Sequence, residues 1–139
     1  MAFSGYLIKV KGTTDAEVPL NCMKLASYKA TPSQRMESDA GRSVTGLLHR
    51  TTVAHTSSKI EFETPPMTNT EVQALLDIFR DRWSDEQQRR LDIEYYNEEE
   101  DSYILADVYM PDIQFTISRI DTTTNTIFYD SFRVAFIEY

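Results

Sequence analysis

Hydrophobic and polar residues alternate along several short stretches of the chain, which is the period expected of half-buried β-strands. In residues 6–11, for example, Tyr6, Ile8 and Val10 fall on one side of an extended chain and Gly12 ends the pattern. Similar stretches predict strands at residues 57–63, 91–97, 102–110, 113–120 and 127–139. Residues 18–30 predict one or two further short strands, with Pro19 near an edge.

Two of these strands are expected to turn a row of large apolar side chains toward the core. One row is predicted in residues 113–120 and the other in the last strand. The two rows are Ile113, Phe115 and Ile117, and Phe128, Phe132, Val134 and Phe136.

One α-helix is predicted, over about residues 69–83. Thr68 is suited to the N-cap, and Glu71 three residues later completes a capping box. Its buried face is expected to consist of Val72, Leu75, Leu76, Phe79 and, one turn further, Trp83.

Short strands, turn signals and a single helix indicate a mainly β protein. We expect an antiparallel β-sandwich or barrel flanked by the helix, because the chain has no alternation of strands and helices that would build a parallel sheet. A length of 139 residues favours one domain over residues 1–139.

The charge is unevenly distributed along the sequence. Residues 1–60 contain 8 Lys/Arg and 4 Asp/Glu (+4), whereas residues 61–139 contain 6 and 18 (−12), giving the net charge of −8. An acidic chain is a poor candidate for nucleic-acid binding, which depends on neutralising phosphates. Copies of a dipolar subunit can attract one another head to tail, although the acidic residues are equally expected to serve solubility alone.

Catalytic and metal-binding motifs are scarce. His49 and His55 lie six residues apart, which is not a usual zinc spacing, and Cys22 lies in a strand-like run where a thiol normally behaves as a small hydrophobe. The acidic run at residues 98–101 lacks the spacing of a calcium loop and fits a solvated hairpin tip. We therefore expect no enzyme activity, no cofactor and no metal. A single cysteine and the lack of a long apolar run or secretory signal predict a protein made in the cytosol, away from membranes.

Residues 31–59 are too polar for a core element and too long for a turn. Their centre is patterned, and it can form two arms around a turn near Gly46 or one extended strand. We expect an arm that buries its apolar residues on a neighbouring subunit, the alternative being a surface loop. The predicted interface residues are Leu47, Leu48, His49, Arg50 and Val53, with Arg35 and Arg42 as ionic partners of an acidic neighbour.

Three stretches carry a resemblance to known proteins: FSGYLIKV, the segment YKATPSQRMESDAGRSVTGLLHRTTVAHTSSKIEFETP, and MTNTEVQALL. They resemble small tail-region structural proteins encoded by long-tailed phages and prophages of Gram-positive bacteria. The expected architecture is also similar to tail-tube, distal-tail and baseplate-hub proteins. That resemblance implies a ring, commonly a hexamer, whose arms pair with neighbours and whose lumen passes DNA.

The sequence therefore predicts a non-enzymatic virion protein, a ring-forming tail or tail-tip subunit. Its expected partners are copies of itself and neighbouring tail proteins, and its expected location is the virion tail after synthesis in the bacterial cytoplasm. Two alternatives remain open. One is a carbohydrate- or receptor-binding module at the tail tip, with Trp83 or the tyrosines as platform, and the other is a small hydrolase with a carboxylate pair.

Overall fold

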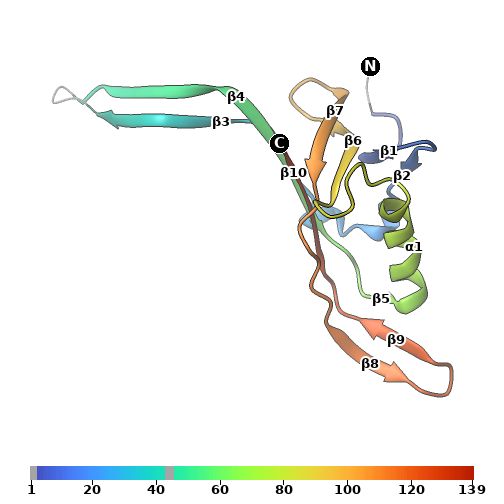
Figure 1. The fold of residues 1–139 in the computed structure, drawn as a ribbon. Helices are drawn as coiled ribbons and strands as arrows, with labels where there is room; N and C mark the ends of the chain where they lie inside the picture. The colour runs from blue at the N-terminus through green and yellow to red at the C-terminus, as the bar shows by residue number, and fades with distance from the viewer. Residues whose placement is uncertain (1–2, 43–45) are drawn as a thin grey trace.

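The computed structural model describes residues 3–42 and 46–139; within strand residues 33–42 and 48–56 it describes the backbone and its pairing but not the side chains. The described residues form ten strands in two antiparallel sheets, together with one α-helix (Figure 1). The predicted mainly β class is confirmed. Of the two predicted architectures the barrel is absent, because the described strands form two open sheets.

The larger sheet has seven strands in the order β2-β1-β6-β7-β10-β4-β3. Adjacent strands run antiparallel throughout. The strands are β1 (Ile8–Lys11), β2 (Ala16–Glu17), β3 (Lys29–Arg42), β4 (Leu48–Glu63), β6 (Arg90–Asn97), β7 (Ser102–Tyr109) and β10 (Arg133–Glu138).

The smaller sheet has three strands in the order β5-β9-β8. They are β5 (Met67–Thr68), β8 (Ile117–Asp121) and β9 (Thr126–Tyr129). The β8–β9 hairpin projects from the lower end of the body in Figure 1, below the helix.

The alternation of the sequence explains the large sheet. On β1 and β6, Ile8 lies opposite Tyr95 and Val10 lies opposite Ile93, and all four side chains are buried on the same face. The same face continues across β10 and β4, where Phe136 lies opposite Ile60. One face of the sheet therefore supplies the core, as the period of two predicts.

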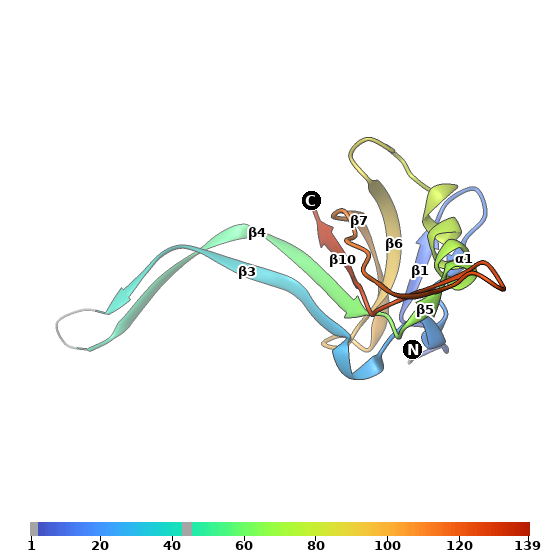
Figure 2. The same ribbon diagram turned by 90° about the horizontal axis from the view of Figure 1, so that it is seen from below.

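Helix α1 (Asn69–Arg80) covers that core face (Figure 2). Its predicted capping box is confirmed, because the Thr68 hydroxyl accepts from the Glu71 amide and the Glu71 carboxylate accepts from the Thr68 amide. The ring centres of Phe79 and Phe136 lie 5.8 Å apart and join helix to sheet. The helix ends at Arg80, so Trp83 lies beyond it and not on its face.

Residues 18–28 do not form the predicted strands, whereas Lys29 and Ala30 begin β3. They contain two short 3₁₀ turns, Leu20–Cys22 and Leu25–Ser27, each closed by a backbone hydrogen bond. The fixed φ of Pro19 favours a turn start at this point. Val18 and Met23 are buried in the core and Leu20 packs against it, which a turn achieves as well as a strand.

The closing segment was predicted as one strand and is two. Between β9 and β10 the chain crosses from the small sheet to the large one, where Thr64 and Phe132 exchange hydrogen bonds of 2.9 and 3.3 Å. Phe128 therefore belongs to a different sheet from Val134 and Phe136, and Phe132 lies in the crossing between them. Phe132, Val134 and Phe136 are buried as predicted.

The predicted inward row in residues 113–117 is confirmed only at Ile113, which is partly buried against the core. The strand starts only at Ile117, and both Phe115 and Ile117 are exposed. The small sheet lies at the margin of the body, so an alternating pattern there has no second layer to cover it.

Residues 31–59 form the two-armed structure that was one of the two alternatives. Strands β3 and β4 pair from Lys29 opposite Glu61 out to Arg42 opposite Leu48. Figures 1 and 2 show this hairpin leaving the body as a long, curved ribbon. No helix in the described ranges has the length and apolarity required to cross a bilayer.

Candidate assembly interface

The outer part of the β3–β4 hairpin, residues 31–59, is called the arm from here on. Strand β10 pairs with β4 only from Lys59 to Glu63. Beyond Lys59, the strand pairing described for β4 is with β3 alone. The arm is thus a two-stranded ribbon, and the register shifts three times along it, between Thr31 and Asp39.

Side chains fix the root of the arm to the body. The amide of Ser58 donates to the Glu138 carboxylate at 2.8 Å, and the hydroxyls of Ser58 and Tyr95 lie 2.7 Å apart in the interior. On the outer face, the Arg133 guanidinium donates to Glu61 at 2.7 Å and lowers the pKa of that carboxyl. The ribbon therefore leaves a well-anchored base.

The predicted interface residues lie in two groups along the arm. Near the tip, Arg42 is opposite Leu48, Gly41 is opposite His49 and Ala40 is opposite Arg50. These pairings bring four of the predicted residues together. The four are Arg42, Leu48, His49 and Arg50.

The other predicted residues are spread out. Arg35 lies closer to the body, opposite Thr56, and Val53 lies in the irregular stretch between register shifts. Side chains of the predicted residues in both strands lie outside the described part of the structure. Leu47, in the connection, is described and is 65% exposed, beside Gly46 in the left-handed region at φ 86°.

A scan against protein families matches residues 1–139 to a model described as "Family of unknown function (DUF6711)". The chain belongs to this family. A search of curated proteins finds no match. Membership of this family assigns no activity.

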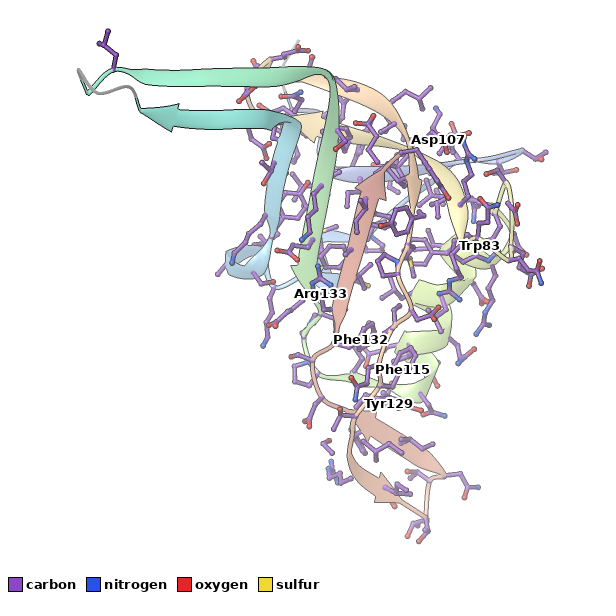
Figure 3. The ribbon with its side chains drawn as sticks, turned by 60° about the vertical axis from the view of Figure 1, so that its left-hand side comes forward. Trp83, Asp107, Phe115, Tyr129, Phe132 and Arg133 are labelled. Atoms are coloured by element: carbon purple, nitrogen blue, oxygen red, sulfur yellow. The ribbon has the colours of Figure 1, made fainter. Side chains whose placement is uncertain are left out.

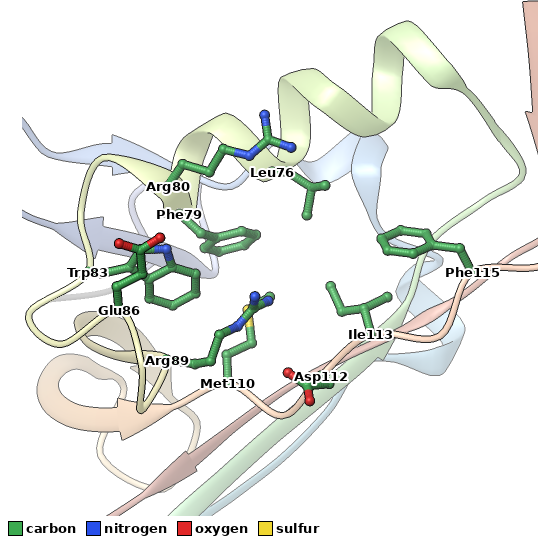
Figure 4. A pocket seen from close by; sticks show the side chains of 10 residues that line it. All are labelled: Leu76, Phe79, Arg80, Trp83, Glu86, Arg89, Met110, Asp112, Ile113 and Phe115. Atoms are coloured by element: carbon green, nitrogen blue, oxygen red, sulfur yellow. The ribbon is translucent and has the colours of Figure 1, made fainter.

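Sequence reasoning missed a hollow between α1 and the segment that leaves β7 (Figure 4). It has a volume of about 420 Å³. Its floor is apolar and includes Leu76, Phe79 and Met110, and Arg80 and Asp112 lie among its charged lining. The residues come from segments far apart in sequence, so periodicity alone could not reveal it.

Trp83 lines this hollow but is already in contact with two neighbours. Its ring stacks on Phe79 with centres 6.5 Å apart, and the Arg89 guanidinium lies 4.9 Å from its centre. The tyrosines, the other platform predicted from the sequence, also contact one another. Tyr6 and Tyr103 stack at 4.4 Å, and Tyr96 meets Tyr103 edge to face at 5.7 Å on the outer face of the sheet.

The residues considered for catalysis and metal binding show no shared site in the described structure. Burial raises the pKa of the half-buried Cys22 thiol, which keeps it protonated and poorly nucleophilic. The described residues contain no cluster of three or more His, Cys, Asp or Glu placed to hold a metal. The side chains of His49 and His55 lie outside the described residues.

The acidic run at residues 98–101 is the turn between β6 and β7, and its side chains are exposed. The side chain of Asn97 accepts from the amides of Glu99 and Glu100, at 2.9 and 3.3 Å. Tyr96 donates to Asp101 at 2.6 Å. These bonds explain the run as an ordered, solvated turn.

Proposed function

We propose that this protein is a non-enzymatic structural subunit of a long-tailed phage or prophage tail, which assembles into a ring with copies of itself through the arm. The arm is the observation that carries the proposal. The resemblance of the sequence to tail-region proteins supplies the biological setting, because fold alone does not assign a function.

The physical argument starts from the weakness of an isolated ribbon. A two-stranded hairpin is at best marginally stable in water, since it buries little and leaves both edges unpaired. The twelve residues from Thr31 to Arg42 extend about 35–40 Å at roughly 3.3 Å per residue. A compact chain of this size is roughly 35 Å across, so the arm is long enough to cross a neighbouring body.

Charge supports a contact between copies. The arm contains four basic residues and two acidic ones (+2): Arg35, Arg42, Arg50 and Lys59 against Glu37 and Asp39. Residues 61–139 have a balance of −12. The positively charged arm of one copy is therefore attracted to the negatively charged residues 61–139 of another copy, which favours association between copies.

Four of the carboxyl groups are poorly suited to act as general acids. A general acid needs a raised pKa, but hydrogen bonds lower the pKa of Asp15, Glu61, Asp107 and Asp121. Each of these four is held by an arginine, a lysine or backbone amides. Such carboxylates serve structure better than proton transfer.

The proposal is tested by shortening the arm without disturbing its root. Residues 38–51 are replaced by Asn-Gly, which joins Glu37 to Thr52, a pair that faces across the ribbon, by a tight hairpin turn. The intact protein is expected to form a closed oligomer by light scattering and negative-stain imaging. The shortened protein is expected to be a folded monomer with unchanged helix content and a cooperative thermal transition.

The matched control is Leu105→Thr, a change of an exposed side chain on β7, outside the arm. It is expected to leave assembly intact. An intact protein that stays monomeric at the highest accessible concentration contradicts the proposal, and so does a shortened protein that still assembles. Recovery of the protein from purified tails, by mass spectrometry, tests the location separately.

The tyrosines favour a second candidate, binding of a carbohydrate or receptor by the outer face of the sheet. The partly exposed rings of Tyr96 and Tyr103 meet edge to face, and the exposed Phe3 ring extends them at 5.8 Å from Tyr96. The buried ring of Tyr6 stacks on Tyr103. This candidate predicts that monomeric protein binds cell-wall glycans and that Tyr103→Ala abolishes binding. Binding without any self-assembly would favour it over the ring.

A further inference from the structure

Strand β8 is the outer strand of the small sheet, which has the order β5-β9-β8. It pairs with β9 on one side, and its other side is an edge of the described sheet. With five residues it is longer than the other edge strands of the body, β2 and β5, which have two each. An edge strand presents a row of backbone donors and acceptors to any strand that can pair with it.

Apolar side chains are concentrated at this edge. Eight large hydrophobic residues are exposed in the described structure, and three of them lie within residues 115–120. Phe115 is 40% exposed, Ile117 50% and Ile120 58%. Scattered apolar residues are normal on a surface, but a cluster on an unpaired edge indicates a contact site.

The hairpin that presents this edge is firmly mounted. The ring of Phe115 lies 5.0 Å from that of Phe132 and 5.9 Å from that of Tyr129, at the base of β8 and β9 (Figure 3). The Asp130 amide donates to the Thr116 carbonyl at 2.9 Å. The edge is therefore held in place before any partner arrives.

Arg119 is the one charged residue in the middle of β8, where a cation commonly blocks edge pairing. Here its guanidinium lies over the ring of Phe128 on the neighbouring strand, 3.8 Å from the ring centre. It is thus drawn toward β9. A register shift between Ile117 and Arg119 leaves Ile120 and Asp121 as the regular end of the strand.

The arm of a second copy has the complementary properties. Strand β3 is the outermost strand of the large sheet, so its outer edge is also unpaired in the described structure. The segment around β8, residues 111–131, contains three acidic residues and one basic one (−2), opposite in sign to the arm (+2). Strand pairing and charge therefore favour the same partner.

The two features lie far apart on one molecule. Figure 1 shows the arm and the β8–β9 hairpin projecting from different ends of the body, so a chain's own arm points away from its own β8. Two different, mutually complementary patches on one subunit give a head-to-tail contact, which closes into a ring when the rotation allows.

We propose that β8 of one copy pairs with the outer edge of β3 in the arm of the next copy, with Ile117 and Ile120 buried in the contact. This inference rests on the proposed function, because it names the surface that receives the arm. It makes each subunit both a donor and an acceptor of one arm.

The first test changes the edge without changing the fold. Ile117→Thr combined with Ile120→Thr keeps β-branched residues on an exposed strand, so the hairpin is expected to persist while its apolar contact is lost. We expect self-association at least about tenfold weaker, as for loss of a central contact. Leu105→Thr is the matched control and is expected to assemble normally.

The second test locates the contact directly. A photoreactive benzophenone side chain is placed at Thr122, just after β8, in a mixture of isotopically light and heavy protein. Crosslinks between light and heavy chains are expected in peptides from residues 29–42. The same group placed at Leu105 is expected to give none in those residues.

The outcomes separate this inference from the proposed function. If the intact protein assembles but the double variant assembles equally well, β8 does not receive the arm and only this inference is wrong. Crosslinks confined to one copy, or to other segments, overturn it in the same way. An intact protein that never assembles contradicts the proposed function together with this inference.

Discussion

The hydroxyls of Ser58 and Tyr95, 2.7 Å apart in the interior, join the root of the arm to the centre of the large sheet. Tyr95→Phe removes this buried hydrogen bond and is expected to lower the free energy of unfolding by about 1–2 kcal/mol. Urea denaturation followed by circular dichroism measures the loss.

Tyr28→Phe is the control for that change. The Tyr28 hydroxyl oxygen is also buried but has no hydrogen-bond partner in the described structure. Its removal is expected to be neutral or slightly stabilising, because an unsatisfied polar group is taken out of the interior. Equal losses from both substitutions would mean that the Ser58–Tyr95 bond contributes nothing.

The capping box predicts a second effect. Thr68→Ala leaves the first turn of α1 without its side-chain acceptor, and we expect a loss of about 1 kcal/mol in unfolding free energy. Thr70→Ala, an exposed change in the same turn, is expected to be neutral or slightly stabilising, since alanine is the better helix former. Thermal unfolding of the two variants is compared. A loss in Thr68→Ala alone indicates the cap, and equal losses in both indicate a general effect of removing a threonine.

The contact of helix and sheet predicts a third effect. Phe136 is fully buried and faces Phe79, so Phe136→Ala is expected to cost about 3–5 kcal/mol by leaving a cavity in the core. Leu105→Ala removes an exposed side chain, 62% accessible, and is expected to change stability by less than about 0.5 kcal/mol. A similar loss of unfolding free energy in both variants would mean that the contact between Phe136 and Phe79 is not part of the stabilising core.

The Arg90–Asp107 ion pair predicts a dependence on pH. The single Nε–H of Arg90 is shared between the two Asp107 oxygens, at 3.0 and 3.1 Å, and Nη2 also donates to Oδ2. These bonds lower the pKa of Asp107. A lowered folded pKa gives stability that is present above the unfolded value of about 4 and is lost as pH falls through the folded one. Both side chains are substantially exposed, so solvent screening keeps the contribution small.

The measurement compares wild type with Asp107→Asn across pH. The difference in melting temperature is expected to be largest near neutral pH and to narrow in acid. Glu98→Gln removes the same charge from an exposed turn position and is expected to show a much smaller difference. If the difference in melting temperature between wild type and Asp107→Asn stays the same as the pH is lowered, the substitution acts through packing and not through the ion pair.

Local signals in the sequence were sufficient for much of the fold. The capping box joins Thr68 and Glu71, which are only three positions apart in the sequence. The alternation that predicts β6 can be read from the residues next to Ile93 and Tyr95 alone. These features depend on nearby atoms. The hairpin arm was one of the alternatives predicted for residues 31–59, because that segment is too polar to be buried within its own chain.

What the sequence could not supply depends on distant parts of the chain. Ile113, Phe115 and Ile117 alternate like a buried strand, and only the position of the small sheet at the margin leaves Phe115 and Ile117 exposed. The crossing at Phe132 depends in the same way on Thr64, which is 68 residues earlier. The apolar edge of β8 was misread as core for this reason.

The anchoring of the arm at Ser58 has a mechanical consequence. Strand β10 ends at Glu138, whose carboxylate accepts from the Ser58 amide just beyond the last paired rung at Lys59. The arm is held at its root and extends about 35 Å from it. A rotation of about 10° at the root would therefore displace its outer end by about 6 Å. We therefore expect Glu138→Gln, which weakens this contact, to change the direction in which the arm points.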